Sequence, residues 1–89
     1  MLRLYGSDIA VASFCAAVKP LRVAFAFVNG QRELCFRVYD DRGRTVLRSS
    51  GISVRRLRDR FSGHGSIVGE VRELIEERGH KLAVWRPPI

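Results

Sequence analysis

Alternating apolar residues on either side of Asn29-Gly30 constrain the fold of this chain more than any other feature. Alternation with a period of two is typical of a strand with one buried face, and an Asn-Gly pair favours a two-residue hairpin turn. Such a turn would place Phe27 opposite Arg32 and Phe25 opposite Leu34. We therefore predict an antiparallel hairpin, and its core face carries Leu21, Val23, Phe25, Phe27, Leu34, Phe36 and Val38.

The opposite face of this hairpin carries smaller side chains than a solvent-exposed face usually does. Ala24, Ala26, Val28 and Cys35 all belong to this outer sheet face. Contiguous apolar patches on a protein surface mark places where another element or another molecule packs. The sequence therefore predicts either a homodimer through the outer sheet face or cover by a helix of the same chain.

The segments around the hairpin complete one small α+β domain, residues 1–89. A turn at 40–43 leads to a third strand at 44–49, so that an antiparallel three-stranded meander forms. Apolar residues at helical spacing predict two main helices, at 8–18 and 66–78, which pack against the sheet.

Serines mark the predicted starts of two helices. Ser7 precedes the first main helix, and Ser53 precedes a short basic helix. A serine hydroxyl at this position accepts a hydrogen bond from an otherwise unpaired backbone N–H group. The apolar side of the short helix is predicted to carry Val54, Leu57 and Phe61.

The two ends of the chain leave the topology open. Residues 1–5 and 80–85 are predicted as additional strands, and 86–89 as an extended tail. With both strands, the order resembles a ferredoxin-like βαββαβ sandwich with one extra strand. Without them the order is αβββα, an arrangement also found in double-stranded RNA-binding domains, although none of that family's contact motifs is visible here.

Charge is the clearest indication of function. Sixteen basic residues, fourteen of them arginine, stand against nine acidic residues, for a net charge of +7. The planar arginine fork pairs with phosphate or carboxylate through two hydrogen bonds. The composition therefore favours binding to nucleic acid, or to an acidic or nucleic-acid-binding protein. A bias of the source genome towards arginine is the alternative explanation.

The cellular compartment is predicted from two further features. The longest apolar run, residues 9–18, is about half of a membrane span. Cys15 and Cys35 lie twenty residues apart without metal-ligand spacing, so we expect two reduced cysteines. These features predict a cytoplasmic protein without a membrane partner.

Half of the arginines fall within nineteen residues of the chain. Phosphate contacts need positive charge at modest geometric precision, which a cluster of this kind supplies. A solvated helix face is the alternative interpretation. The predicted contacts are Arg42, Arg44, Arg48, Arg55, Arg56, Arg58 and Arg60.

A glycine-rich segment follows this cluster. Gly63-His64-Gly65 precedes Ser66 at a predicted helix start, where free backbone N–H groups can hold an anion. Together with Leu57, Phe61 and Gly69, the segment resembles the helix-hairpin-helix motif of non-specific DNA-binding proteins, whose Gly-x-Gly hairpin joins two helices. It departs from that motif at His64 and Arg72, where aliphatic residues are usual. The alternative is a plain turn.

The sequence contains few residues suited to catalysis. No zinc-protease, Cys-x-x-Cys or phosphate-loop motif occurs, and Glu70, Glu73 and Glu77 are expected to pair with arginines rather than to bind a metal. We therefore predict a non-catalytic nucleic-acid-binding domain without cofactor or metal. Two alternatives stay open: an inhibitor or adaptor of phage or mobile-element type, similar to anti-CRISPR proteins, and a small ribonuclease toxin that uses His64 as general acid or base.

Overall fold

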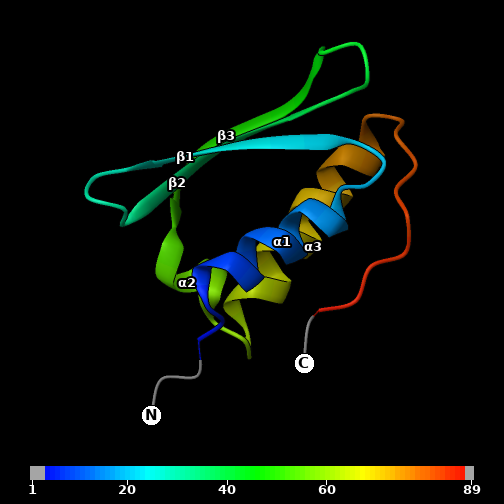
Figure 1. The fold of residues 1–89 in the computed structure, drawn as a ribbon. Helices are drawn as coiled ribbons and strands as arrows, with labels where there is room; N and C mark the ends of the chain where they lie inside the picture. Colours follow the sequence, from blue (N-terminus) through cyan, green and yellow to red (C-terminus); the bar gives the residue numbers. More distant parts are fainter. Residues whose placement is uncertain (1–3, 88–89) are drawn as a thin grey trace.

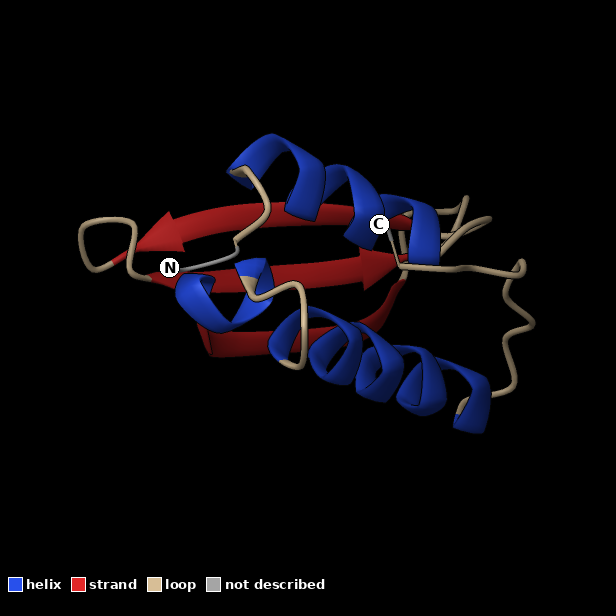
Figure 2. Cartoon of the chain, turned by 90° about the horizontal axis from the view of Figure 1, so that it is seen from below, coloured by secondary structure: helices blue, strands red, loops and turns tan. Residues whose placement is uncertain are grey.

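Three antiparallel strands form one sheet, and the two longer helices cover one of its faces in the computed structural model, which describes residues 4–87 (Figure 1). The predicted α+β class is confirmed. The elements in chain order are α1 (Ser7–Ala17), β1 (Arg22–Val28), β2 (Glu33–Tyr39), β3 (Thr45–Ser53), α2 (Val54–Arg58) and α3 (Gly63–Glu77). Figure 2 shows the helical layer in front of the sheet, with the outer sheet face behind it.

The register of the first hairpin differs by two residues from the prediction. Phe25 lies opposite Phe36, because the connection contains four residues, 29–32, instead of two. Asn29, Gly30 and Gln31 all adopt positive φ, at 52°, 65° and 67°. A shift of two residues leaves each side chain on its own face, so the predicted core face is correct. Its outermost member is the exception, since Phe27 is 45% exposed at the sheet end.

Strand β3 is longer than predicted, since it continues past Ser49 to Ser53. Gly51 makes this continuation possible by adopting a φ of 76°, within an irregular step of the ladder between Leu34 and Phe36. Leu47 faces Val38 on the core side, as expected. The sheet therefore has a long third strand at its edge.

The core lies between the sheet and the two long helices. Phe14 of α1 is fully buried at its centre, and its ring meets those of Phe25 and Phe36 edge to face, with centroids 5.2 and 5.0 Å apart. Val68 and Ile75 of α3 are fully buried and complete the core on the helical side. This packing fixes both helices on one face of the sheet.

Of the two predicted serine caps, one is present in the structure and one is not. Ser53 does cap α2, where its Oγ accepts a hydrogen bond from the Arg56 backbone N–H at 3.3 Å. Ser7 is the first residue of α1, and that helix start has no side-chain cap. Leu57 is buried as expected, but Phe61 lies beyond the end of α2 and is 73% exposed.

The predicted terminal strands do not join the sheet within the described residues. Leu4 forms only an isolated bridge with Asp59, and residues 1–3 lie outside the description, as do 88–89 of the predicted tail. Residues 80–85 form no strand. The Ala83 N–H donates to the Lys19 carbonyl at 2.9 Å instead. The αβββα order with an added short helix is therefore observed, and the ferredoxin-like alternative is not.

Candidate nucleic-acid interface

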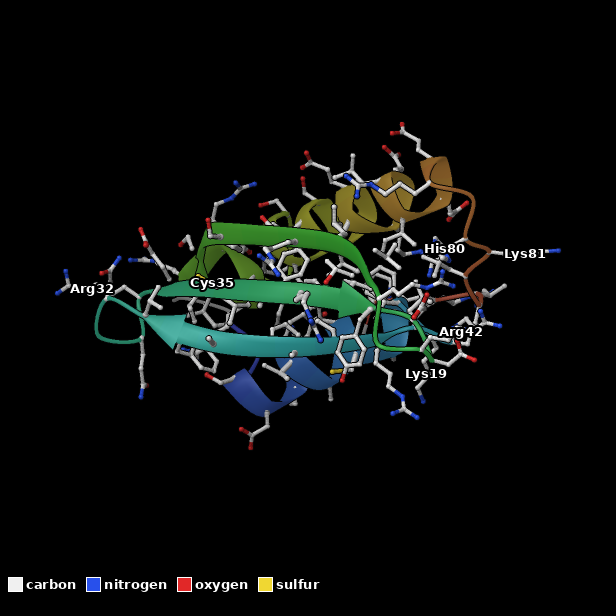
Figure 3. All side chains as sticks on the ribbon, turned by 90° about the horizontal axis from the view of Figure 1, so that it is seen from above. Lys19, Arg32, Cys35, Arg42, His80 and Lys81 are labelled. Atoms are coloured by element: carbon white, nitrogen blue, oxygen red, sulfur yellow. The ribbon has the colours of Figure 1, made fainter. Side chains whose placement is uncertain are left out.

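The predicted arginine cluster divides into separate groups. Arg42 and Arg44 lie in the turn before β3, whereas α2 follows the other end of that strand. The nine residues of β3 span about 30 Å at roughly 3.3 Å per residue. Arg48 lies between the two groups, opposite Arg37 on the outer sheet face. Figure 3 shows Arg42 at one end of the molecule and Arg32 at the other.

The four arginines in and after α2 also point in different directions. Arg55 and Arg58 border a hollow near the β1–β2 loop, and Arg56 borders a cleft next to α3. The Arg58 Nε donates to the Tyr5 carbonyl at 2.7 Å, and the Arg60 guanidinium lies 5.4 Å from the centre of the Tyr5 ring. The short helix therefore presents no single arginine face.

Three arginines from two elements converge on the first of these sites, which we call the arginine hollow. Arg32 comes from the β1–β2 loop, and Arg55 and Arg58 come from α2; together they border a volume of about 390 Å³. The Arg32 carbonyl accepts a hydrogen bond from the Val54 N–H at 3.0 Å, which ties the loop to the start of α2. The hollow is thus built by contacts within the fold.

Arg32 is the residue of this site that sequence reasoning missed. A two-residue turn would have placed it within the ladder, opposite Phe27, rather than in a loop. The four-residue connection instead carries Arg32 beyond the end of the sheet and against α2. The positive φ of Gln31 is needed for this path, and few residues other than glycine adopt it.

Contacts within the chain use part of the predicted anion site at residues 63–66. Gly63, His64, Gly65 and Ser66 form the first turn of α3, not a hairpin, so the resemblance to a helix-hairpin-helix motif does not hold. Asp59 accepts hydrogen bonds there, from the Phe61 N–H at 3.0 Å and the Ser62 hydroxyl at 3.1 Å, both in the approach to the helix. The backbone carbonyl of Asp59 accepts a hydrogen bond from the His64 N–H group. The backbone carbonyl of Ser62 accepts one from the Ser66 N–H group. Two of the backbone donors in this segment, those of His64 and Ser66, are thus used internally.

Asp59 should make part of the stability of the fold depend on pH. The Phe61 N–H and the Ser62 hydroxyl lower the pKa of its carboxyl group. Because its pKa is lower in the folded state, the Asp59 carboxylate stabilises the fold at pH values above about 3.9, the ordinary pKa of aspartate. This stabilisation is lost as the pH falls through the lowered pKa. Asp59→Asn should therefore flatten the acid side of the stability curve. Urea midpoints measured across acid pH test this, with Asp41→Asn in an exposed turn as control. An equal effect of both substitutions would contradict it.

His64 is the most buried polar residue, with 0% exposure. Its Nδ1 donates to the Leu57 carbonyl at 2.6 Å, since a carbonyl can only accept, and its Nε2 accepts from the Ser13 hydroxyl at 2.8 Å. The Tyr5 ring lies against it, with centroids 5.1 Å apart. A side chain without exposed surface cannot touch phosphate, a partner or a scissile bond. His64 therefore links elements of the fold, and its burial argues against the predicted contact role.

The acidic residues leave the arginines largely uncompensated. In the described part of the chain the single ion pair joins Arg44 to Asp40 at 3.3 Å. The predicted pairing of Glu70, Glu73 and Glu77 with arginines does not occur among these residues. Most of the positive charge is thus available to a ligand.

Residues 4–87 contain no cluster of metal ligands, no helix able to span a membrane and no disulfide. No group of three or more histidines, cysteines or acidic residues is placed to hold a metal ion there. No helix in this range combines the length and the apolar character needed to cross a membrane. Cys15 and Cys35 are free thiols, as expected, and burial raises the pKa of Cys15.

No protein-family model, curated protein or solved structure matches the chain. The functional interpretation therefore depends on the surface of the molecule itself. Three basic residues, Arg32, Arg55 and Arg58, line one common hollow from two elements.

Proposed function

We propose that this protein binds nucleic acid without catalysing a reaction, and that the arginine hollow holds the phosphate backbone. The convergence of Arg32, Arg55 and Arg58 on one hollow is the observation that carries the proposal. Three guanidinium groups around one site suit a phosphate, whose oxygens accept several charge-assisted hydrogen bonds at once. We also propose that the protein acts in the cytoplasm.

The hollow is partly organised before any ligand arrives. The Tyr5 carbonyl holds Arg58, and the Val54 N–H holds the loop that carries Arg32. Side chains that are already ordered lose less conformational entropy on binding. The net charge of +7 adds long-range attraction for any polyanion. Because phosphate contacts carry no base information, the expected binding is weakly sequence-specific.

The experiment is a salt titration of binding to short labelled single- and double-stranded DNA and RNA. Each lost phosphate contact reduces the salt slope by about 0.9 for duplex DNA. Arg32→Gln combined with Arg55→Gln should therefore reduce the salt slope by the amount expected for the loss of two contacts. Arg58 is left intact because it also holds Tyr5.

Arg42→Gln combined with Arg44→Gln is the matched control, since it removes the same charge at the opposite end of β3. If the salt slope fell more in this control than in the Arg32→Gln, Arg55→Gln variant, the proposal that the arginine hollow binds phosphate would be contradicted. Absence of binding to all four nucleic acids at low salt would exclude the function itself.

A protein-binding role, as an inhibitor or adaptor of phage or mobile-element type, is the second candidate. One observation favours it: a shallow depression of about 620 Å³ lies on the outer sheet face, lined by Ala24, Ala26 and Cys35 and bordered by Arg37 and Arg48. Small side chains let another protein surface approach the sheet closely, and arginines at the rim favour an acidic partner. A homodimer through this face is the related proposal, and light scattering over a range of concentrations tests it.

A further inference from the structure

The outer edge of β3 has no neighbouring strand among residues 4–87. The strand order β1-β2-β3 makes it an edge strand, and the predicted strand at 80–85 runs elsewhere. Near the start of the strand, the Val46 carbonyl accepts a hydrogen bond from the Arg78 guanidinium. From residue 47 to residue 52, no backbone hydrogen bond joins this edge to another described segment. An unpaired edge of this kind is a template for a further strand.

A cleft opens directly beside this edge, between β3 and α3. Figure 3 shows α3 extending beyond the free edge of β3, so that the helix forms the far wall. The cleft has a volume of about 370 Å³. Its apolar lining includes Phe36, Leu47, Ile67, Val71 and Leu74. Of these, Leu74 is 37% exposed, which leaves apolar surface for a ligand side chain.

The charges at the rim indicate the chemistry of the ligand. Arg48 and Arg56 border the cleft on the side of β3 and α2, and Glu70 borders it on the α3 side. Neither arginine forms an ion pair with another described residue. A ligand carboxylate on the arginine side would meet two uncompensated guanidinium groups.

We propose that the free edge of β3 and this edge cleft bind an extended peptide segment of a partner protein by strand addition. The peptide backbone pairs with β3, and alternate apolar side chains enter the cleft. An aspartate or glutamate of the peptide lies near Arg48 and Arg56. The proposal is independent of nucleic-acid binding, because the two sites have different arginines and share only Ser53 of their linings.

Other occupants fit these features less well. Nucleic acid has no strand of amide groups to pair with the β3 edge, and the apolar floor offers nothing to phosphate. A second copy joined through the same edge would bring two sets of Arg48 and Arg56 together along one seam, where like charges oppose pairing. A peptide with carboxylates meets all three features of the site.

The first experiment selects binders from a displayed library of short random peptides, with the nuclease-treated full chain as bait. We expect enriched sequences with apolar residues at every second position and an acidic residue beside them. The best synthetic peptide is then methylated at alternate backbone nitrogens. Methylation on the edge that faces β3 should weaken binding about tenfold, through loss of one or two hydrogen bonds. Methylation on the opposite edge should leave the affinity unchanged.

The second experiment changes the cleft instead of the peptide. Leu74→Lys should weaken peptide binding about tenfold, since it places a charge where an apolar side chain enters. Val84→Lys is the matched control, because Val84 is 90% exposed and does not line the cleft. Circular dichroism and urea midpoints check that both variants fold.

Several results would overturn the proposal. These are a selection without enrichment, enrichment of apolar residues at helical spacing of three and four, and equal effects of the two methylation patterns. A dimer that Leu74→Lys dissociates would assign the edge to a second copy, and so would also overturn it.

Discussion

Gly63→Ala should lower the free energy of unfolding by about 3 kcal/mol, which is at the upper end of the usual cost of overpacking. Gly63 is the first residue of α3 and lies directly against the backbone of Arg56. A Cβ atom at this position would overlap the Arg56 carbonyl oxygen and lie 2.8 Å from the carbonyl carbon. Because both atoms belong to the backbone, no side-chain rotation can relieve the clash.

Gly69→Ala is the matched control, since it lies in the interior of the same helix. A Cβ atom at Gly69 meets nothing within 4 Å. Replacing a helical glycine by alanine at an unhindered site should raise the free energy of unfolding by about 0.5–1 kcal/mol. Urea denaturation of both variants measures the difference. If Gly63→Ala were as stable as Gly69→Ala, the close approach of α3 to α2 would be contradicted.

His64→Ala should lower the free energy of unfolding by about 3–4 kcal/mol, in the range found when a large buried ring is truncated. The substitution leaves a cavity beside Tyr5 and removes both hydrogen bonds of the ring. The Leu57 carbonyl and the Ser13 hydroxyl then remain buried without that partner, which adds to the cost. The total is a large part of the 5–15 kcal/mol that stabilises a typical domain.

A double-mutant cycle separates the hydrogen bond from the packing. Ser13→Ala alone should cost about 1–2 kcal/mol, because the Nε2 of His64 loses its partner. In the His64→Ala background the same change should cost about 1 kcal/mol less, since the hydrogen bond is already absent. Additive effects of the two substitutions would show that the Ser13–His64 hydrogen bond does not couple α1 to α3.

The core face of the first hairpin could be predicted from the sequence, whereas its register could not. A two-residue error preserves the alternation, so Leu34, Phe36 and Val38 are buried in either register. The register depends on the length of the loop, and Asn29-Gly30 is compatible with more than one turn. The deciding feature is the positive φ of Gln31, a conformation for which glutamine has no intrinsic preference.

The candidate site was harder to predict, because it depends on contacts between distant residues. Clustering of arginines along the chain indicated one patch, but the unexpected length of β3 places Arg42 and Arg55 at opposite ends of a strand. The glycines at 63 and 65 predict a hairpin or a plain turn. Gly63 instead permits close packing, and buried His64 forms a hydrogen bond with Ser13, 51 residues earlier in the chain. Local sequence patterns carry no information about such a partner.

Part of the preference for arginine over lysine is explained by the internal framework of the molecule. Arg58, Arg72 and Arg78 each donate to backbone carbonyls of segments distant in the sequence, and Arg72 alone joins Ala17 to Ala83, with distances of 2.6 and 2.9 Å. Both Arg72 hydrogen bonds come from its Nη1 nitrogen. A guanidinium holds its donors in a rigid plane, a geometry that an ammonium group lacks. A version of this chain with lysine in place of every arginine would keep its net charge and lose that fixed geometry. The high isoelectric point is therefore partly a consequence of arginines that hold segments of the fold together through these hydrogen bonds.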